Sequence, residues 1–210
     1  MNYIEDIIER LTLIHGNAAC ELNFSTPFEL LVAVILSAQC TDKRVNEVTK
    51  DLFVRYNKPE HYAGMSVEEL SEMIYSCGFY KSKARSIIAA SRSIIEDFNG
   101  EVPSTAEELI KLKGVGIKTA NVVKSVAFGG DAIAVDTHVM RVSRRLGLAR
   151  EKTPDKITLE LMDKVPKNRW TRLHHLLVHH GRYICKSRKP DCDKCNLALY
   201  CKYFQEVINV

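Results

Sequence analysis

The residues best suited to chemistry lie between positions 112 and 138. Gly114 and Gly116 flank Val115 in a short glycine segment, Lys118 follows directly, and Asp136 comes soon after. Glycines permit a tight turn, and free N–H groups at the start of a helix bind phosphate without reading base sequence. Lys118 offers an amine that can act as a nucleophile, and Asp136 offers a charge partner for it. The segment therefore predicts a phosphate grip beside a reactive amine.

Each of these residues also has an ordinary structural interpretation. A G-x-G segment can be a helix end and a turn that binds nothing. Lys118 can be a solvated surface lysine, and Asp136 can be the N-cap of a helix that begins at Thr137. These alternatives stay open until other parts of the chain are considered.

Four cysteines near the end of the chain have the spacing C-x6-C-x2-C-x5-C: Cys185, Cys192, Cys195 and Cys201. Four soft ligands on one loop suit zinc or an iron–sulfur cluster. The loop has one C-x2-C pair instead of two and differs from ferredoxin-type runs, so spacing leaves both metals open. A group of buried thiols without metal is the alternative. The other three cysteines are expected to be core thiols: Cys20, Cys40 and Cys77.

Basic residues gather in the last third of the chain, although the net charge is only +4. Residues 137–150 hold four arginines and no acid, and the insert between the first two loop cysteines contains Lys186, Arg188 and Lys189. This distribution indicates a surface that faces phosphates, with solvated helix faces as the alternative. Histidines at 174, 175, 179 and 180 could suggest another metal site, but no carboxylate motif accompanies them.

Composition is that of an ordinary globular protein, with 46% hydrophobic and 27% charged residues among 210. The N-terminus shows no signal peptide, and the longest apolar run, Leu30 to Leu36, is too short to span a bilayer. Seven cysteines, an odd number, argue against a disulfide framework. We therefore expect a cytoplasmic protein that contacts no membrane.

Helical patterns cover nearly the whole chain, so the predicted fold class is all-α. Residues 4–11 show an apolar stripe of helical period, and residues 28–38 are apolar almost all round. Thr26-Pro27 marks the start of that second helix, Asp42 is the expected cap of the next, and Ser66 and Ser104 each open a capping box. The last long helix is expected over residues 169–180, with Gly181 as its cap.

These motifs together resemble the endonuclease III family of the helix–hairpin–helix DNA glycosylase superfamily. The resemblance rests on the hairpin at residues 112–120, on Val135-Asp136-Thr137-His138, on residues 36–42 and on the four-cysteine loop. It runs from about residue 20 to residue 203, and the order of the motifs makes it specific.

The resemblance implies two helical domains that flank a DNA-binding cleft. One, residues 21–130, would be a six-helix barrel with the helix–hairpin–helix at about 107–125. The other would join residues 1–20 to residues 131–210 and hold a [4Fe–4S] cluster on the loop of residues 185–201. The four cysteines of that loop would be the cluster ligands, so the resemblance favours iron–sulfur over zinc.

The resemblance also implies a reaction and an association with the nucleoid when the protein is bound to DNA. A monomer would remove oxidised pyrimidines from double-stranded DNA, after flipping the damaged nucleotide out of the stack. Lys118 would attack C1′, the resulting Schiff base would permit β-elimination at the lesion or at an abasic site, and Asp136 would assist. Further DNA contacts would come from the hairpin residues, from the basic insert and from three single residues: Gln39, Phe79 and His138. Gln39 and Phe79 would wedge into the duplex, with a buried core aromatic as the alternative for Phe79.

Two rival functions remain at this point. A monofunctional glycosylase resembles the chain, but such relatives usually lack a lysine at position 118 and carry a further C-terminal domain, whereas here the sequence ends nine residues after Cys201. A DNA-binding or redox-sensing module without catalysis would need only the hairpin, the basic insert and the cluster.

Overall fold

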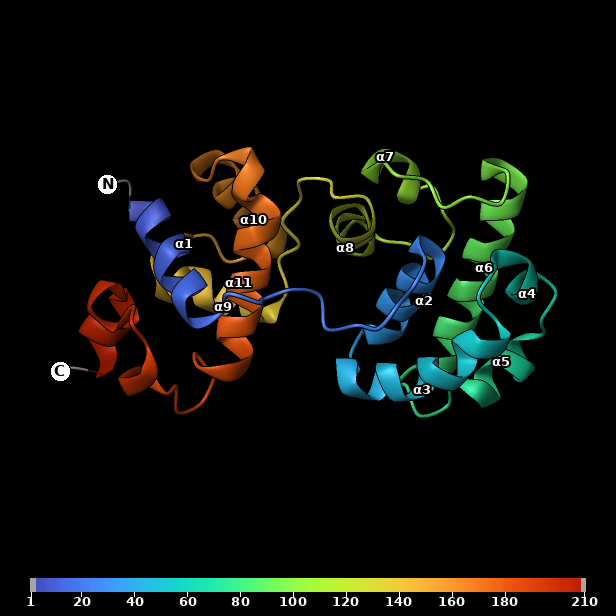
Figure 1. Cartoon of the computed structure of the whole chain (residues 1–210), viewed down its shortest axis with the longest axis horizontal. Helices are drawn as coiled ribbons and strands as arrows, with labels where there is room; N and C mark the ends of the chain where they lie inside the picture. The colour runs from blue at the N-terminus through green and yellow to red at the C-terminus, as the bar shows by residue number, and fades with distance from the viewer. Residues whose placement is uncertain (1–2, 209–210) are drawn as a thin grey trace. The chain divides into compact units, whose positions relative to one another are not determined.

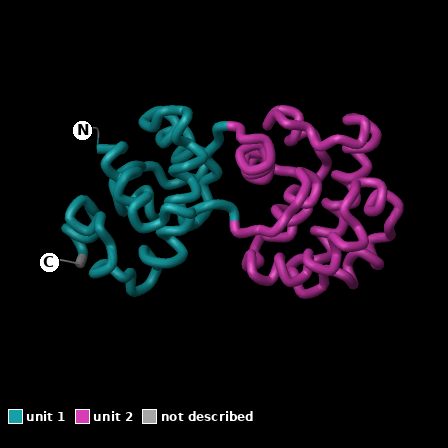
Figure 2. Tube along the Cα trace, in the orientation of Figure 1, with its two compact units in different colours: residues 1–20, 131–210 teal, residues 21–130 magenta. Residues whose placement is uncertain are grey.

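The computed structural model describes residues 3–208, and within that range it contains helices and no β-strand. The all-α prediction is confirmed. The chain divides into two compact units (Figure 2). Residues 21–130 form the first, called here the hairpin unit, and the described parts of residues 1–20 and 131–210 form the second, called the cysteine unit. No helix of the described chain is long and apolar enough to cross a membrane.

The hairpin unit is built around helix α2 (Pro27–Ser37), whose residues Phe28 to Leu36 are all buried. Helices α3, α6 and α8 pack against it, and α4 and α5 pack on α6 (Figure 1). The other helices of the unit are α3 (Asp42–Arg55), α4 (Pro59–Ala63), α5 (Val67–Met73), α6 (Tyr80–Phe98), α7 (Ala106–Leu109) and α8 (Ile117–Ala127). A helix that is apolar on every side needs neighbours on every side, which explains its central place.

Side-chain caps fix where the helices of this unit begin. Thr26 caps α2 by accepting from the Glu29 N–H, and Ser66 forms the expected capping box with Glu69. Two predicted caps are one residue out. Thr41, not Asp42, caps α3, and Thr105, not Ser104, caps α7 through the Glu108 N–H. Each pair places two suitable cap residues side by side, and the one whose oxygen reaches the free N–H three residues on becomes the cap.

The cysteine unit joins the two ends of the chain. The apolar stripe of α1 (Tyr3–Ile14) packs with α9 (Thr137–Arg145) and α11 (Trp170–Tyr183) in one core, as its periodicity predicts. Helix α10 (Pro154–Lys164) completes that core, and the turn η1 (Lys167–Arg169), which has no buried residue, leads into α11. Three short turns of helix follow in the cysteine loop and beyond it: η2 (Cys192–Lys194), η3 (Ala198–Tyr200) and η4 (Phe204–Ile208).

Gly181 does not end α11 as expected, because the helix continues to Tyr183. A Cβ at position 181 would lie 2.8 Å from the Cβ of His138 on α9. The glycine is therefore needed for the close approach of two helices, not for a turn. This approach brings the start of the cysteine loop next to α9.

Candidate nucleic-acid site and cysteine pocket

The turn between α7 and α8 depends on Gly114. Its φ is +85°, in the left-handed region, and a Cβ there would lie 2.7 Å from the Cβ of Ser86 on α6. Glycine is thus required twice, for the backbone conformation and for the approach to α6. Val115 is buried, and its N–H donates to the Leu112 carbonyl at 3.0 Å. Val115 anchors the turn to the interior of the unit, which leaves the two glycines at its surface.

Gly116 is the N-cap residue of α8, but it has no side chain that could cap the helix. Its φ is −93°, a Cβ would meet nothing within 4 Å, and no side chain caps the helix. Within the described chain, the N–H groups of Gly114, Gly116 and Ile117 donate to no acceptor. Free N–H groups at the positive end of a helix, with open space beside them, are suited to receive an anion. Neither the backbone nor a neighbour requires glycine at 116, so the space itself is the reason for it.

Lys118 lies in the first turn of α8, directly behind these free N–H groups, and its side chain is exposed. No hydrogen bond or ion pair holds it within the described chain. The start of α8 thus presents free N–H groups and an unengaged amine within three residues.

Gln39 and Phe79 line one surface cavity with Gly114 and Thr119. Both have left-handed backbones, with φ of +52° and +59°, which is strained for residues other than glycine. Phe79 is 68% exposed, so the alternative of a buried core aromatic is wrong. The structure brings both residues next to the hairpin on the surface of one unit, where an aromatic ring is free to contact a ligand.

Lys83 is a residue of this region that the motifs did not reveal. Its side chain is buried, and its Nζ donates to the Leu36 carbonyl at 2.7 Å. Its own N–H donates to the carbonyl of Phe79 at 3.1 Å. Lys83 therefore ties the end of α2, which precedes Gln39, to the start of α6, which follows Phe79. A lysine four residues before Ile87, on the buried side of α6, was the available signal.

Asp136 is the N-cap of α9, and its Oδ1 accepts from the Val139 N–H at 2.7 Å. The residue is half-buried, and no hydrogen bond within the described chain reaches its Oδ2. One oxygen therefore fixes the carboxylate and the other stays open to a ligand. His138, in the first turn of the same helix, has its Nδ1 3.1 Å from Nη2 of Arg141.

Two arginines of the basic run have structural partners, contrary to the prediction that the run faces phosphates. Arg141 donates to the carbonyls of Cys185 and Gly181 at 3.0 and 2.8 Å. Arg145 donates to Cys185 Sγ at 3.3 Å and to the Lys186 carbonyl at 2.7 Å. Five N–H donors in a planar fork suit an arginine to such bridging. Helix α9 thus carries Asp136 at its start and holds the cysteine loop from its last turns.

The four loop cysteines line one pocket together with apolar residues such as Leu146, Ile184 and Phe204. Four soft sulfur donors around one pocket are the ligand set of a four-thiolate metal site, and they suit an iron–sulfur cluster as they suit zinc. The donor set therefore fits an iron–sulfur cluster.

Burial controls the charge of these thiols. It raises the pKa of the Cys195 thiol to about 11, and it also raises the pKa values of Cys192 and Cys201. An apolar pocket disfavours thiolate unless positive charge lies beside it. A metal centre would supply that charge.

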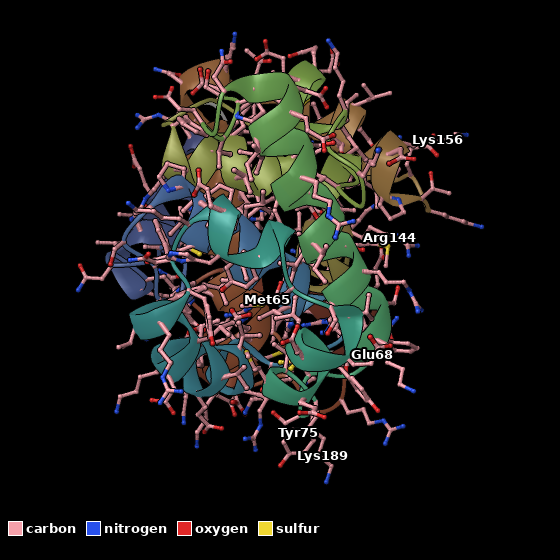
Figure 3. All side chains as sticks on the ribbon, turned by 90° about the vertical axis from the view of Figure 1, so that its right-hand side faces the viewer. Met65, Glu68, Tyr75, Arg144, Lys156 and Lys189 are labelled. Atoms are coloured by element: carbon pink, nitrogen blue, oxygen red, sulfur yellow. The ribbon has the colours of Figure 1, made fainter. Side chains whose placement is uncertain are left out.

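The basic insert is a closed loop on the surface. The Ile184 carbonyl accepts from the N–H groups of both Lys186 and Asp191, at 2.9 and 3.0 Å. Arg188 and Lys189 are exposed, and Lys189 points outward at the edge of the molecule (Figure 3). Lys186 forms an ion pair with Asp191 at 2.9 Å, so its charge is partly engaged. Arg188 and Lys189 are the cations of the insert that remain for a phosphate backbone.

Comparison with known proteins places this geometry in a class. The family model described as "HhH-GPD superfamily base excision DNA repair protein" matches residues 32–167. Endonuclease III of Bacillus subtilis (strain 168) is 51% identical over 207 residues, which are 98% of this chain and 94% of that protein. Endonuclease III of Escherichia coli (strain K12) is 44% identical over 202 residues, 96% of each.

Solved structures agree. A trapped endonuclease III–DNA covalent intermediate has a TM-score of 0.93 and 47% identity, and the match covers 98% of this chain and 97% of that one. A thermostable thymine-DNA glycosylase, at a TM-score of 0.86 and 24% identity, shares the fold. The chain belongs to the endonuclease III family within the HhH-GPD superfamily of base excision DNA repair proteins.

Proposed function

We propose that the protein is a bifunctional DNA glycosylase and abasic-site lyase that acts on duplex DNA in base excision repair. Its substrates are oxidised pyrimidines and abasic sites, and it works as a monomer. The observation that carries the proposal is the start of α8, where free N–H groups, open space and the unengaged Lys118 amine lie within three residues. The likeness to an endonuclease III that was trapped covalently on DNA supports a covalent step.

Lys118 is the proposed nucleophile. With the damaged nucleotide out of the stack, neutral Nζ attacks C1′, and the C1′–base bond breaks as the base leaves with its electron pair and takes up a proton. The new C1′–Nζ bond becomes a Schiff base after the sugar ring opens. Loss of the C2′ proton then expels the 3′ phosphate, which cuts the strand on the 3′ side.

Asp136 assists this step. Its Oδ1 is occupied by the Val139 N–H, so the carboxylate keeps a fixed direction while Oδ2 stays open. A fixed carboxylate stabilises positive charge that develops on the sugar, and it can move a proton at Oδ2. Its role as a cap and its role in catalysis therefore use different oxygens.

The remaining contacts hold the DNA. Gly114 and Gly116 present N–H groups to a phosphate, and Arg188 and Lys189 lie on the exposed insert. Gln39 and Phe79 fill the gap that the flipped nucleotide leaves, which explains why an aromatic ring stays exposed on a strained backbone. His138 contacts the sugar or its phosphates from the first turn of α9.

We assign the domains and the cofactor in the same way. The hairpin unit is the six-helix barrel domain with its helix–hairpin–helix at about 107–125, and the cysteine unit is the iron–sulfur domain. A [4Fe–4S] cluster is held by four thiolates: Cys185, Cys192, Cys195 and Cys201. The pocket that these residues share supports this assignment. When bound, the cluster supplies a rigid charged centre that keeps the basic insert in shape.

Trapping with borohydride tests the reaction. Incubation with a duplex that carries an oxidised pyrimidine should give a covalent adduct, and a duplex with an abasic site should give one without the base-release step. Lys118→Gln should abolish both adducts while DNA binding persists. Lys113→Gln, which removes an exposed charge from the same turn, is the matched control and should still form them.

The rivals give different results. A monofunctional glycosylase would release the base without an adduct, and a non-catalytic module would bind the duplex and do neither. Either result with the unaltered protein would overturn the proposal.

A further inference from the structure

Two histidines form a chain of contacts that ends on a cysteine of the loop. His15, just after α1, places its Nε2 3.1 Å from Nδ1 of His180 on α11. The other nitrogen of His180, Nε2, lies 3.5 Å from Cys195 Sγ. His180 is 1% exposed and His15 is half-buried. Both ring nitrogens of a buried imidazole are therefore engaged, one by a sulfur and one by a second ring.

The chemistry of the partners assigns the protons. A thiolate ligand carries lone pairs and no proton, so Nε2 of His180 must carry the hydrogen that points at Cys195 Sγ. In the neutral ring, whose single hydrogen is on Nε2, Nδ1 has a lone pair. His15 then donates its Nε2–H to that lone pair. In this arrangement of protons each of the three groups takes part in a hydrogen bond.

We infer that His180 is a positioning residue that donates a hydrogen bond to the Cys195 sulfur, and that His15 fixes the tautomer in which it does so. The inference rests on the proposed iron–sulfur cluster. Hydrogen bonds to cluster sulfurs stabilise the reduced, more negative form and so raise the reduction potential. His180 thus acts on the cluster through its ligand.

A second side chain donates to another cysteine of the loop. Nη1 of Arg145 lies 3.3 Å from the sulfur of Cys185. Two of the four proposed ligands therefore receive a hydrogen bond from a side chain that reaches across the unit. His180 differs from Arg145 in one respect, because its N–H is present only in one tautomer and so depends on His15.

The contacts also explain the run of histidines on α11. His180 uses both nitrogens within the unit, and His179 has its Nε2 3.0 Å from the Ala19 carbonyl. His15 lies edge-on to both rings, with centroids 5.4 Å from His180 and 6.3 Å from His179. These rings join α11 to the segment after α1.

The test compares three variants of the purified, cluster-loaded protein. His180→Leu removes the donor, His15→Leu leaves the donor and removes what orients it, and His175→Gln is a control on the same helix, where its ring packs on His174. The midpoint potential is measured by voltammetry, and the Fe–S stretching bands are recorded by resonance Raman in water and in D2O. The Leu197 backbone N–H also hydrogen-bonds to Cys195, so the readout is the part of the D2O shift that a variant loses relative to wild type, and a purely structural role would not change it.

We expect His180→Leu to lower the equilibrium constant for one-electron reduction about tenfold, which is a fall of 59 mV, and to reduce the D2O shift of the Fe–S bands. His15→Leu should shift the potential in the same direction by less, and His175→Gln should leave it unchanged.

The outcomes separate two failures. Wild-type protein without bound iron would overturn the proposed cofactor together with this inference. The inference alone would be overturned if the iron-loaded His15 and His180 variants had the same potential and the same D2O shift as wild type. If His180→Leu does not fold, His15→Leu decides, because the half-buried His15 can be replaced without leaving a cavity in the core. A His15→Leu protein with the wild-type potential and D2O shift would then overturn the inference.

Discussion

The starts of α8 and α9 differ in one respect that separates their roles. Helix α9 begins at a carboxylate, and Asp136 takes up its Val139 N–H. Helix α8 begins at Gly116, which has no side chain, and its first N–H groups have no partner within the described chain. A closed start stabilises the fold and fixes a side chain, whereas an open start keeps its partial positive charge for a ligand.

This difference shows how one structural feature, a helix N-terminus, serves two purposes in the same protein. In the hairpin unit the cost of free N–H groups is tolerated because they face open space and solvent. In the cysteine unit the cap residue, Asp136, is itself the proposed catalytic carboxylate. If this is right, changes at the uncapped start of α8 should affect DNA binding and catalysis, and loss of the cap of α9 should affect stability.

Loss of the amine behind the open start should have the largest effect. Lys118→Gln removes the nucleophile, so borohydride adduct and strand cleavage should fall by at least about a thousandfold, because the amine that forms the Schiff base is gone. The fold should be unaffected because Lys118 is exposed and has no partner within residues 3–208. Gel analysis of the adduct and urea unfolding give the two readouts. A variant that still cuts at an abasic site through an adduct would assign the nucleophile to another residue.

Asp136 should separate capping from catalysis. Asn caps a helix about as well as Asp, so Asp136→Asn should keep its stability while base release slows by roughly 10²- to 10⁴-fold. Asp136→Ala should show the same slowing and also lose about 1 kcal/mol of unfolding free energy. Single-turnover kinetics and urea unfolding are measured on both. Equal stability losses in the two variants would show that the carboxylate charge, not the cap hydrogen bond, holds the start of α9.

The two glycines of the hairpin should respond in opposite ways. Gly114→Ala places a Cβ 2.7 Å from Ser86 Cβ at a φ of +85°, so it should cost about 1–3 kcal/mol of stability. Gly116→Ala meets nothing within 4 Å, so stability should hold while DNA affinity falls about tenfold, roughly 1.4 kcal/mol, because the methyl group occupies the approach of the phosphate. Unfolding and fluorescence-anisotropy titrations distinguish the two. Unchanged affinity in Gly116→Ala would mean that the start of α8 is not a phosphate site.

Features of local sequence were predictable. The stripe of α1, the uniformly apolar α2, the caps at Thr26 and Ser66 and the glycine hairpin follow from periodicity and turn chemistry. Choices between neighbouring caps were not, as at Thr41 and Asp42, because a side-chain oxygen must reach one particular N–H. The spacing of the cysteines predicted a shared site, and the structure places all four around one pocket.

Contacts across the sequence were beyond such reasoning. Arg145 lies 40 residues from Cys185, and His15 lies 165 residues from His180. Nothing in the local pattern marks Arg145 as different from the exposed Arg144 beside it. Pattern analysis identifies which side of a helix faces inward, but not which distant backbone group a long polar side chain will reach.

The smallest predicted effect concerns another set of N–H groups closed by a carboxylate. Glu160 on α10 accepts from Lys164 Nζ at 2.6 Å and from the N–H groups of Arg150 and Glu151 at 2.8 and 3.2 Å. The hydrogen bond from Lys164, followed by those from the backbone, lowers the pKa of Glu160 to about 2. The hydrogen bonds to Glu160 should stabilise the cysteine unit as the cap at Asp136 does, without any part in catalysis.

The pH dependence follows from the sign of that shift. A folded-state pKa below the ordinary value of about 4.3 gives stability that is complete above pH 4.3 and is lost as the pH falls towards 2. Glu160→Gln should therefore cost about 1 kcal/mol near neutral pH, since the groups are partly exposed, and this cost should shrink between about pH 5 and pH 2. Glu151→Gln, whose ion pair with Lys156 is long at 3.8 Å and exposed, is the control and should cost almost nothing. Because the partners of Glu160 all lie outside the proposed site, base release by Glu160→Gln should match wild type. Slower release would mean that these hydrogen bonds also shape the site.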